Sequence, residues 1–179
     1  MTFASIEGQK TEILGLIERW PASRLAYRQS EDAWCALHVI DHLVKVESGV
    51  IAEARRGLLS PQRITVRDRL GFFFLDRAFR SRMKVKVPPS ATRVLPDLTC
   101  SLEVLRERWR DSRTELAQLL ARGKPAELEL GVFRHPVSGL MNIPQILRFF
   151  SAHIHHHGYQ IARIAEASER TVEFPSGAT

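Results

Sequence analysis

The stretch SAHIHHHGYQIARI, residues 151–164, contains four of the seven histidines of the chain. With the residues before it, this stretch predicts a long helix. One face of that helix carries residues at steps of three or four: Ile143, Ile146, Phe150, His153, His157, Gln160 and Ile164. Residues at this spacing share one side of a helix and turn toward a core. His153 and His157 are therefore expected to point inward, one turn apart, whereas His155 points away and His156 lies at the margin.

A second stripe of this kind lies earlier in the chain and holds one histidine. Its members are Cys35, Val39, His42, Val46 and Val50. If the two helices face each other, His42 brings a third imidazole to His153 and His157. Two histidines one turn apart can share one ion. The alternative is that each ring is a core residue, which requires a hydrogen-bond partner for its donor and its acceptor in an apolar interior.

We therefore predict a site for one divalent metal ion, with His42, His153 and His157 as its ligands. Neutral imidazole suits zinc, nickel, copper or iron. The expected metal is zinc or nickel, with iron or manganese as alternatives. Three protein nitrogens leave at least one position for water or substrate, which is the open arrangement of catalytic ions.

Three further polar side chains are candidates for the surroundings of this site. Gln160 either hydrogen-bonds a ligand or its water, or faces solvent at the end of the bundle. His38 is either a proton shuttle or a residue at the margin of the core. His135, in the loop before the last helix, either reaches the mouth of the site or packs its own turn.

The carboxylates nearest His42 in the sequence are Asp41 and Glu47. Helical geometry puts both off the face that carries His42. Neither is therefore predicted as a ligand, and neither is expected to act as a general base.

Four long helices are predicted, over residues 3–20, 31–59, 97–122 and 142–168. Ser30 is the expected N-cap of the second, followed by acidic residues in the first turn. Between the second and third lies a long connection, with a helix within residues 66–83 and an extended, proline-rich segment over 85–96. Residues 124–140 are expected to form a loop with a short extended piece. The pattern predicts an all-α four-helix bundle with a long crossover between helices two and three, as a single domain over residues 1–179.

The composition is that of an ordinary globular protein, with 179 residues and 44% hydrophobic residues. The net charge is +6, but basic residues alternate with acidic ones, as in RERWRDSRTE (106–115), which disfavours a nucleic-acid partner. No apolar run of about eighteen residues is present, so no membrane partner is expected. The two cysteines have no ligand-like spacing, and we expect reduced thiols in a bacterial cytoplasm.

Two segments resemble motifs of the DinB/YfiT-like superfamily. LHVIDHLVKVE (37–47), preceded by Trp34, resembles its second-helix motif. HPVSGLMNIPQILRFFSAHIHHHGYQI (135–161) resembles its fourth-helix motif, in which H-x-x-x-H is followed by glutamine. The resemblance implies a four-helix bundle that holds a divalent metal through three histidines, and these fall on His42, His153 and His157.

The resemblance also implies a range of activities. Members include metal-dependent transferases that join low-molecular-weight thiols to electrophiles, and others resemble hydrolases or isomerases of thiol conjugates. A thiol and an electrophile are thus the expected small-molecule partners. The alternative is a non-catalytic metal- or ligand-binding bundle with a role in stress response. The oligomeric state stays open, and a homodimer is compatible with such a bundle.

Overall fold

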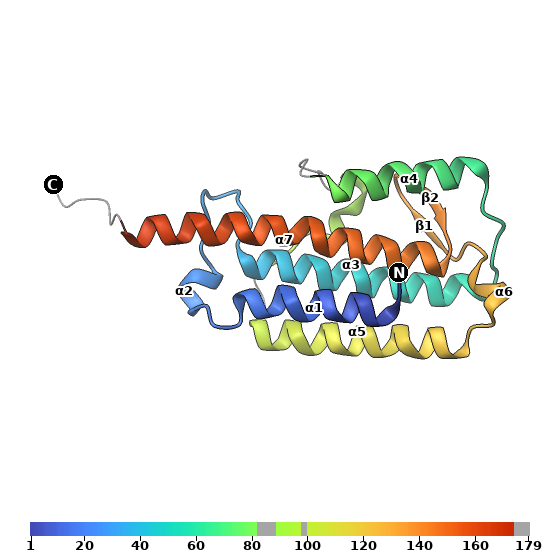
Figure 1. Ribbon diagram of the computed structural model, residues 1–179, viewed down its shortest axis with the longest axis horizontal. Coiled ribbons are helices and arrows are strands. Elements are labelled where there is room, and N and C mark those ends of the chain that lie inside the picture. Colours follow the sequence, from blue (N-terminus) through green and yellow to red (C-terminus); the bar gives the residue numbers. More distant parts are fainter. Residues whose placement is uncertain (82–88, 98–99, 174–179) are drawn as a thin grey trace.

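A computed structural model describes residues 1–81, 89–97 and 100–173. Five helices dominate it: α1 (Phe3–Ile17), α3 (Ala36–Gly57), α4 (Val66–Arg80), α5 (Leu102–Arg122) and α7 (Ile143–Glu173). The helices α1, α3, α5 and α7 form the bundle (Figure 1). The helices α3 and α5 run in the same direction, opposite to α1 and α7, because the chain returns along α4 between them (Figure 1). The predicted all-α bundle with a long crossover between its second and third long helices is confirmed.

The starts of two bundle helices differ from the sequence prediction. Ser30 is not the N-cap of α3, because Cys35 occupies that position; the carbonyl of Ser30 accepts a turn hydrogen bond from the amide of Ala33. The helix begins at Ala36, where the Nδ1 atom of His38 accepts a hydrogen bond from the amide of Cys35. The helix α5 begins at Leu102 instead of residue 97, after the N-cap Ser101.

The other two bundle helices begin where the sequence predicts. A hydroxyl cap on Thr2 starts α1, which ends at Ile17, three residues before the predicted end. Asn142 and Gln145 exchange backbone and side-chain hydrogen bonds at the start of α7. These reciprocal bonds satisfy amides that have no partner inside a helix.

The connections contain shorter elements, namely α2 (Ala22–Leu25), the 3-10 helix η1 (Pro89–Val94), α6 (Pro125–Leu128), β1 (Phe133–His135) and β2 (Gly139–Met141). The extended segment predicted over residues 85–96 is wrong for residues 89–94, which form the 3-10 helix η1 with three residues per turn. Residues 85–88 lie outside the described residues. The helix predicted within residues 66–83 is confirmed as α4.

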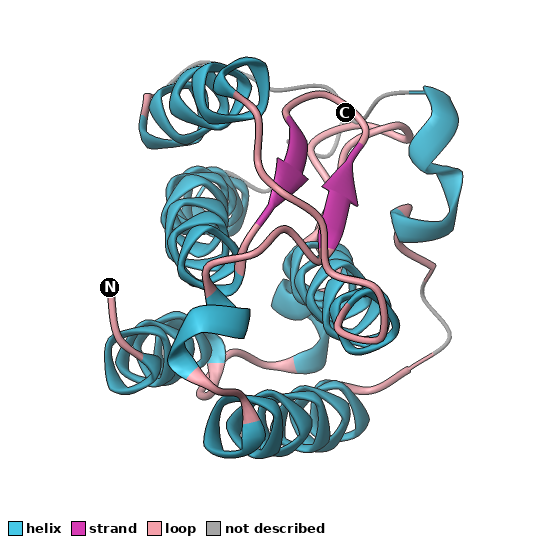
Figure 2. Cartoon of the chain, turned by 90° about the vertical axis from the view of Figure 1, so that its right-hand side faces the viewer, coloured by secondary structure: helices cyan, strands magenta, loops and turns pink. Residues whose placement is uncertain are grey.

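The two strands form an antiparallel hairpin on the same side of the bundle as α4 (Figure 2). Gly139 begins β2 with a φ of +84°, a conformation that favours glycine. A Cβ atom on Gly139 would also lie 2.3 Å from an oxygen of Asp68. That carboxylate accepts a hydrogen bond from the amide of Leu140 and so ties the hairpin to the first turn of α4.

The apolar core consists of two clusters of buried side chains. One joins α4, the hairpin and the first half of α7 to the second half of α3 and to residues of α1 and α5, and it includes Phe79 and Phe150. The other joins α1, α3, α5 and the second half of α7, and includes Trp109 and Ile161. His153 lies between Ala152 of the first cluster and Ile154 of the second, whereas His42 and His157 are flanked on their helices by members of the second cluster. No helix among the described residues is long and apolar enough to cross a membrane.

Candidate metal centre

Three buried histidines from two helices converge at the centre of the bundle. His42 projects from α3, and His153 and His157 project from adjacent turns of α7. The Nε2 atom of His153 lies 3.2 Å from that of His42 and 3.1 Å from that of His157. One ring nitrogen from each of the three residues lies within 4.8 Å of the others. All three side chains are less than 7% exposed, at 4%, 3% and 6%.

The second ring nitrogen of two of these histidines is held by a hydrogen bond. The Nδ1 atom of His42 lies 2.6 Å from the carbonyl oxygen of Val94. The Nδ1 atom of His157 lies 2.9 Å from the side-chain oxygen of Gln160. Because these oxygens only accept, the hydrogens reside on Nδ1. Both Nε2 atoms therefore carry a lone pair directed into the cluster.

The arrangement leaves polar atoms without enough partners in the absence of a cation. A hydrogen on Nε2 of His153 can satisfy one of the two facing lone pairs but not both. The Nδ1 atom of His153 is buried and has no hydrogen-bond partner among the described residues. With its hydrogen on Nδ1, His153 presents a third lone pair, and three imidazole nitrogens within 4.8 Å of one another are a donor set that suits a divalent metal ion. The three histidines therefore fit a cation better than they fit one another.

Burial keeps these imidazoles neutral, which is the form that binds metal. It lowers the pKa of His157 to about 3. Burial, followed by the proximity of His157 and His42, lowers the pKa of His153 well below its usual value. Burial also lowers the pKa of His42. At neutral pH no proton competes with an ion for the converging nitrogens.

Aromatic side chains surround the cluster. The ring of Trp34 lies 5.0 Å from that of His42 and stacks 6.2 Å from that of His157. Phe149 stacks on His153 at 5.4 Å, and Phe79 of α4 meets the same ring edge-on at 5.2 Å. We did not predict these neighbours from sequence, because Trp34 precedes a helix and Phe79 belongs to the crossover. Helical periodicity cannot predict either contact.

The structure places the other candidate residues as follows. Gln160 contacts one member of the cluster, because its side-chain oxygen accepts a hydrogen bond from Nδ1 of His157. His38 lies at the start of α3, where its Nδ1 atom also lies 3.2 Å from the Sγ atom of Cys35. His135 accepts hydrogen bonds from the amides of Val137 and Ser138 and so packs its own turn.

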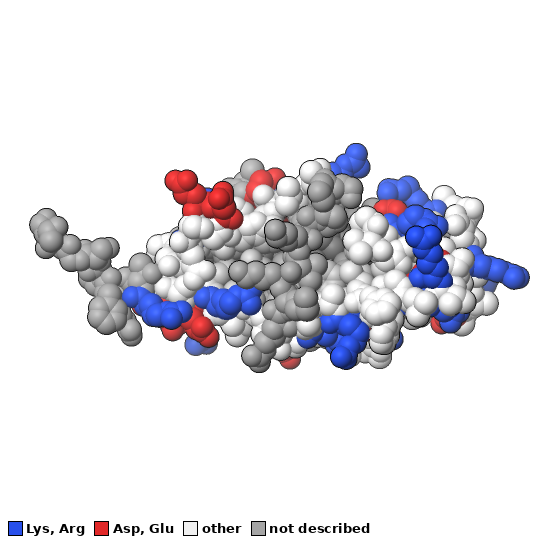
Figure 3. Space-filling model, turned by 90° about the horizontal axis from the view of Figure 1, so that it is seen from above, with Lys and Arg blue, Asp and Glu red and all other residues white. Residues whose placement is uncertain are grey.

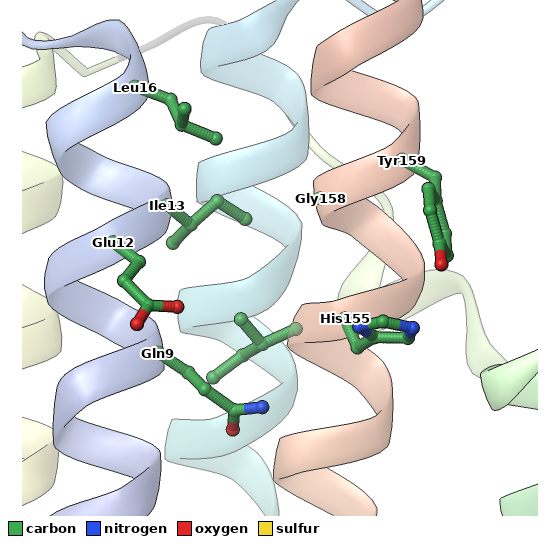
Figure 4. Close-up of a pocket in the computed structure, with 8 residues that line it drawn as sticks. Gln9, Glu12, Ile13, Leu16, His155, Gly158 and Tyr159 are labelled. Carbon is green, nitrogen blue, oxygen red and sulfur yellow. The ribbon is translucent and has the colours of Figure 1, made fainter.

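The remaining two histidines lie outside the cluster, as the helical stripe predicts. His155 is exposed, and His156 is partly buried at the margin, with its ring 5.5 Å from that of Phe79. A pocket between α1 and α7 is lined by His155 together with Glu12, Leu16 and Tyr159 (Figure 4). None of the three converging histidines lines this pocket.

Both buried carboxylates of α3 have partners other than the three histidines. The Oδ2 atom of Asp41 pairs with Lys45 at 2.7 Å. Glu47 accepts two hydrogen bonds from Arg113, at 2.7 and 2.8 Å, and a third from the indole of Trp109. Neither carboxylate belongs to the group of converging ring nitrogens, as predicted.

The fold and the site together define a helical bundle with a buried three-histidine group that could hold a metal ion. A model of the DinB superfamily matches residues 6–161, and the chain belongs to that superfamily. The crystal structure of TT2238, described as a four-helix bundle protein, is similar to this structure with a TM-score of 0.56. That similarity covers 90% of this chain and 99% of that chain at 21% sequence identity, and it concerns the fold alone. No curated protein matches the sequence.

Proposed function

We propose that the protein is a metal-dependent enzyme that transfers a low-molecular-weight thiol to an electrophile, or that hydrolyses or isomerises a related thiol conjugate. The observation that carries this proposal is the convergence of three Nε2 atoms in a group that contains no carboxylate. His42, His153 and His157 would hold the ion. When bound, a divalent cation supplies Lewis acidity, which lowers the pKa of a thiol or water in contact with it.

The chain's own residues support a substrate that brings its own acidic group. A water nucleophile is commonly activated by a nearby general base. Asp41 and Glu47, the carboxylates nearest His42, are already paired with cationic side chains. A thiol needs no such base when its pKa is lowered directly. The arrangement of acidic side chains therefore favours thiol transfer over hydrolysis.

Charge and apolar surface around the cluster suit an anionic thiol and an apolar electrophile. Burial is the main cause of the lowered pKa of His156 and of His157, and the positive charge of Arg163, exposed on α7, adds to the lowering in both. Trp34 and Phe79 supply aromatic surface on either side of the histidines. Basic side chains are also scattered over the face that includes α4 (Figure 3). Such charges raise the local concentration of an anionic substrate, although salt weakens the effect.

The second candidate function is a non-catalytic metal- or ligand-binding bundle. Its support is the burial of the three histidines, none of which is more than 6% exposed. An ion with a structural role has a closed coordination sphere, and its removal unfolds the protein. A catalytic ion instead keeps an exchangeable position, and the fold survives chelation.

The proposal is tested by measuring thiol consumption. Bacillithiol, mycothiol, glutathione and coenzyme A are each offered with monochlorobimane to metal-loaded and chelated protein. We expect conjugation of at least one thiol that requires the metal and is lost in His153→Ala. Equal rates for loaded and chelated protein with every thiol would favour the binding bundle. The proposed setting is a bacterial cytoplasm, with a homodimer as the proposed assembly.

A further inference from the structure

The last residues of the crossover are fastened to α3 directly beside His42. The carbonyl of Val94 accepts the hydrogen bond from Nδ1 of His42, at 2.6 Å. The next carbonyl, that of Leu95, accepts one from the ammonium group of Lys45, at 3.2 Å. The amide of Asp97 donates to the Oδ2 atom of Asp41, at 2.9 Å. Backbone groups of residues 94–97 thus meet side chains from one face of α3.

Asp41 and Lys45 form the centre of this attachment. Lys45 pairs with Asp41 at 2.7 Å and with Asp97 at 3.0 Å. The side chain of Asp41 is only 3% exposed, whereas that of Lys45 is 24% exposed. A buried carboxylate is stable only when it is paired and hydrogen-bonded, and here both the ammonium group and the Asp97 amide serve it. Residues 94–97 are therefore held by charge-assisted contacts.

The attachment determines which nitrogen of His42 is available to an ion. As long as the carbonyl of Val94 stays in place, the hydrogen of His42 resides on Nδ1 and the lone pair on Nε2. If residues 94–97 move away, Nδ1 loses its acceptor and the ring can take the other tautomer or turn. Hydrogen-bond partners of metal ligands act in this way, and their loss weakens metal affinity by about 10–100-fold.

We infer that Asp41 and Lys45 are positioning residues for the histidine cluster, which act by clamping residues 94–97 so that the Val94 carbonyl orients His42. This inference rests on the proposed function, since it requires an ion at the cluster. It goes beyond that function by coupling the crossover to the ion. Coupling of this kind is reciprocal: the clamp strengthens ion binding, and the ion strengthens the clamp.

The first experiment is a zinc titration against a competing chromophoric chelator. We expect Asp41→Asn and Lys45→Gln each to weaken zinc binding by about 10–100-fold. A purely electrostatic effect would move the two variants in opposite directions, because one loses a negative and the other a positive charge. Lys45→Arg keeps the ion pairs and should retain most of the affinity. Arg106→Gln, which removes an exposed pair with Glu18 on other helices, is the matched control and should bind as the wild type does.

The second experiment reads the coupling in the other direction. Zinc should slow hydrogen exchange of the Asp97 amide in the wild type and should not do so in His42→Ala. If the wild type binds zinc, and Asp41→Asn and Lys45→Gln bind it as tightly as the wild type, the clamp inference is overturned and the proposed function stands. Zinc-independent exchange of that amide would also overturn it. If the wild type binds no divalent metal, the proposed function fails and the inference fails with it.

Discussion

His42 and His153 are 111 positions apart in the sequence, yet their Nε2 atoms lie 3.2 Å apart at the centre of the bundle. The register of α3 against α7 is set by apolar neighbours on both helices, among them Val39 and Phe150, which are fully buried. Packing in such a core tolerates little displacement. The free energy gained by burying the apolar core therefore offsets the cost of burying the three imidazoles, and the packing fixes their positions.

The stability of the metal-free protein should fall steeply in mild acid. The pKa of His157 is about 3 in the folded protein and about 6.5 in an unfolded chain. Between these values the unfolded state binds a proton that the folded state does not. The contribution of each such histidine to the free energy of unfolding is therefore fully present above about pH 6.5. It is lost as the pH falls toward 3, by up to about 1.4 kcal/mol per pH unit.

Urea unfolding of chelated protein at pH 7, 6 and 5 measures this loss. The lowered pKa values of His42 and His153 act in the same direction as that of His157. We expect the free energy of unfolding to depend less steeply on pH in His157→Leu, because this variant lacks one of these titrating groups. An identical dependence in variant and wild type would place the acid sensitivity elsewhere. Added zinc should raise the melting temperature of the wild type. The difference between the melting temperatures with and without zinc should be absent in His153→Ala.

The ion pair of Glu47 and Arg113 should contribute to the stability of the fold and should not affect metal binding. Glu47 is fully buried, and Arg113 is 2% exposed. Replacing Glu47 leaves Arg113 only its longer ion pair with Glu7, at 3.5 Å. Removing the hydrogen-bonded partner of a buried charge costs about 3–5 kcal/mol. We expect Glu47→Gln to lower the free energy of unfolding in urea by this amount while zinc still binds at one ion per chain. Glu18→Gln, in an exposed pair with Arg106, should have little effect on either quantity.

Helical periodicity was sufficient to predict the cluster because the direction of a side chain on a helix is a local property. Spacings of three or four residues among the histidines and the apolar residues of each helix are enough to identify the faces that carry His42, His153 and His157 without knowledge of the fold. The Val94 carbonyl could not be found in this way, because a backbone atom of an irregular segment leaves no pattern in the sequence. Sequence alone does not predict the start of α3 for a related reason: its N-cap is Cys35 instead of Ser30, and the amide of Cys35 donates to the ring of His38, a residue that is uncommon in this role.

Arg163 should contribute to substrate binding more than to the chemical step. Its side chain is exposed on α7, the helix of His153 and His157, and its charge adds a small contribution to the lowering of the His157 pKa, which is mainly caused by burial. We expect Arg163→Gln to raise the KM for an anionic thiol by a few-fold, since exposed charge pairs contribute about 0.2–1 kcal/mol. The kcat should change little, and the effect should shrink at high salt. Arg108→Gln, on the exposed side of α5, is the control. An equal rise in both variants would indicate a nonspecific effect of net charge.

The most direct test of the three-histidine centre is the metal content of untagged protein after saturation with zinc and removal of excess ion. We predict about one zinc per chain for the wild type and for His155→Ala, whose side chain points to solvent. His42→Ala, His153→Ala and His157→Ala should each lose most of it, because each removes one of three nitrogens that lie within 4.8 Å of one another. Metal retained in all three variants, or lost in His155→Ala alone, would contradict the account.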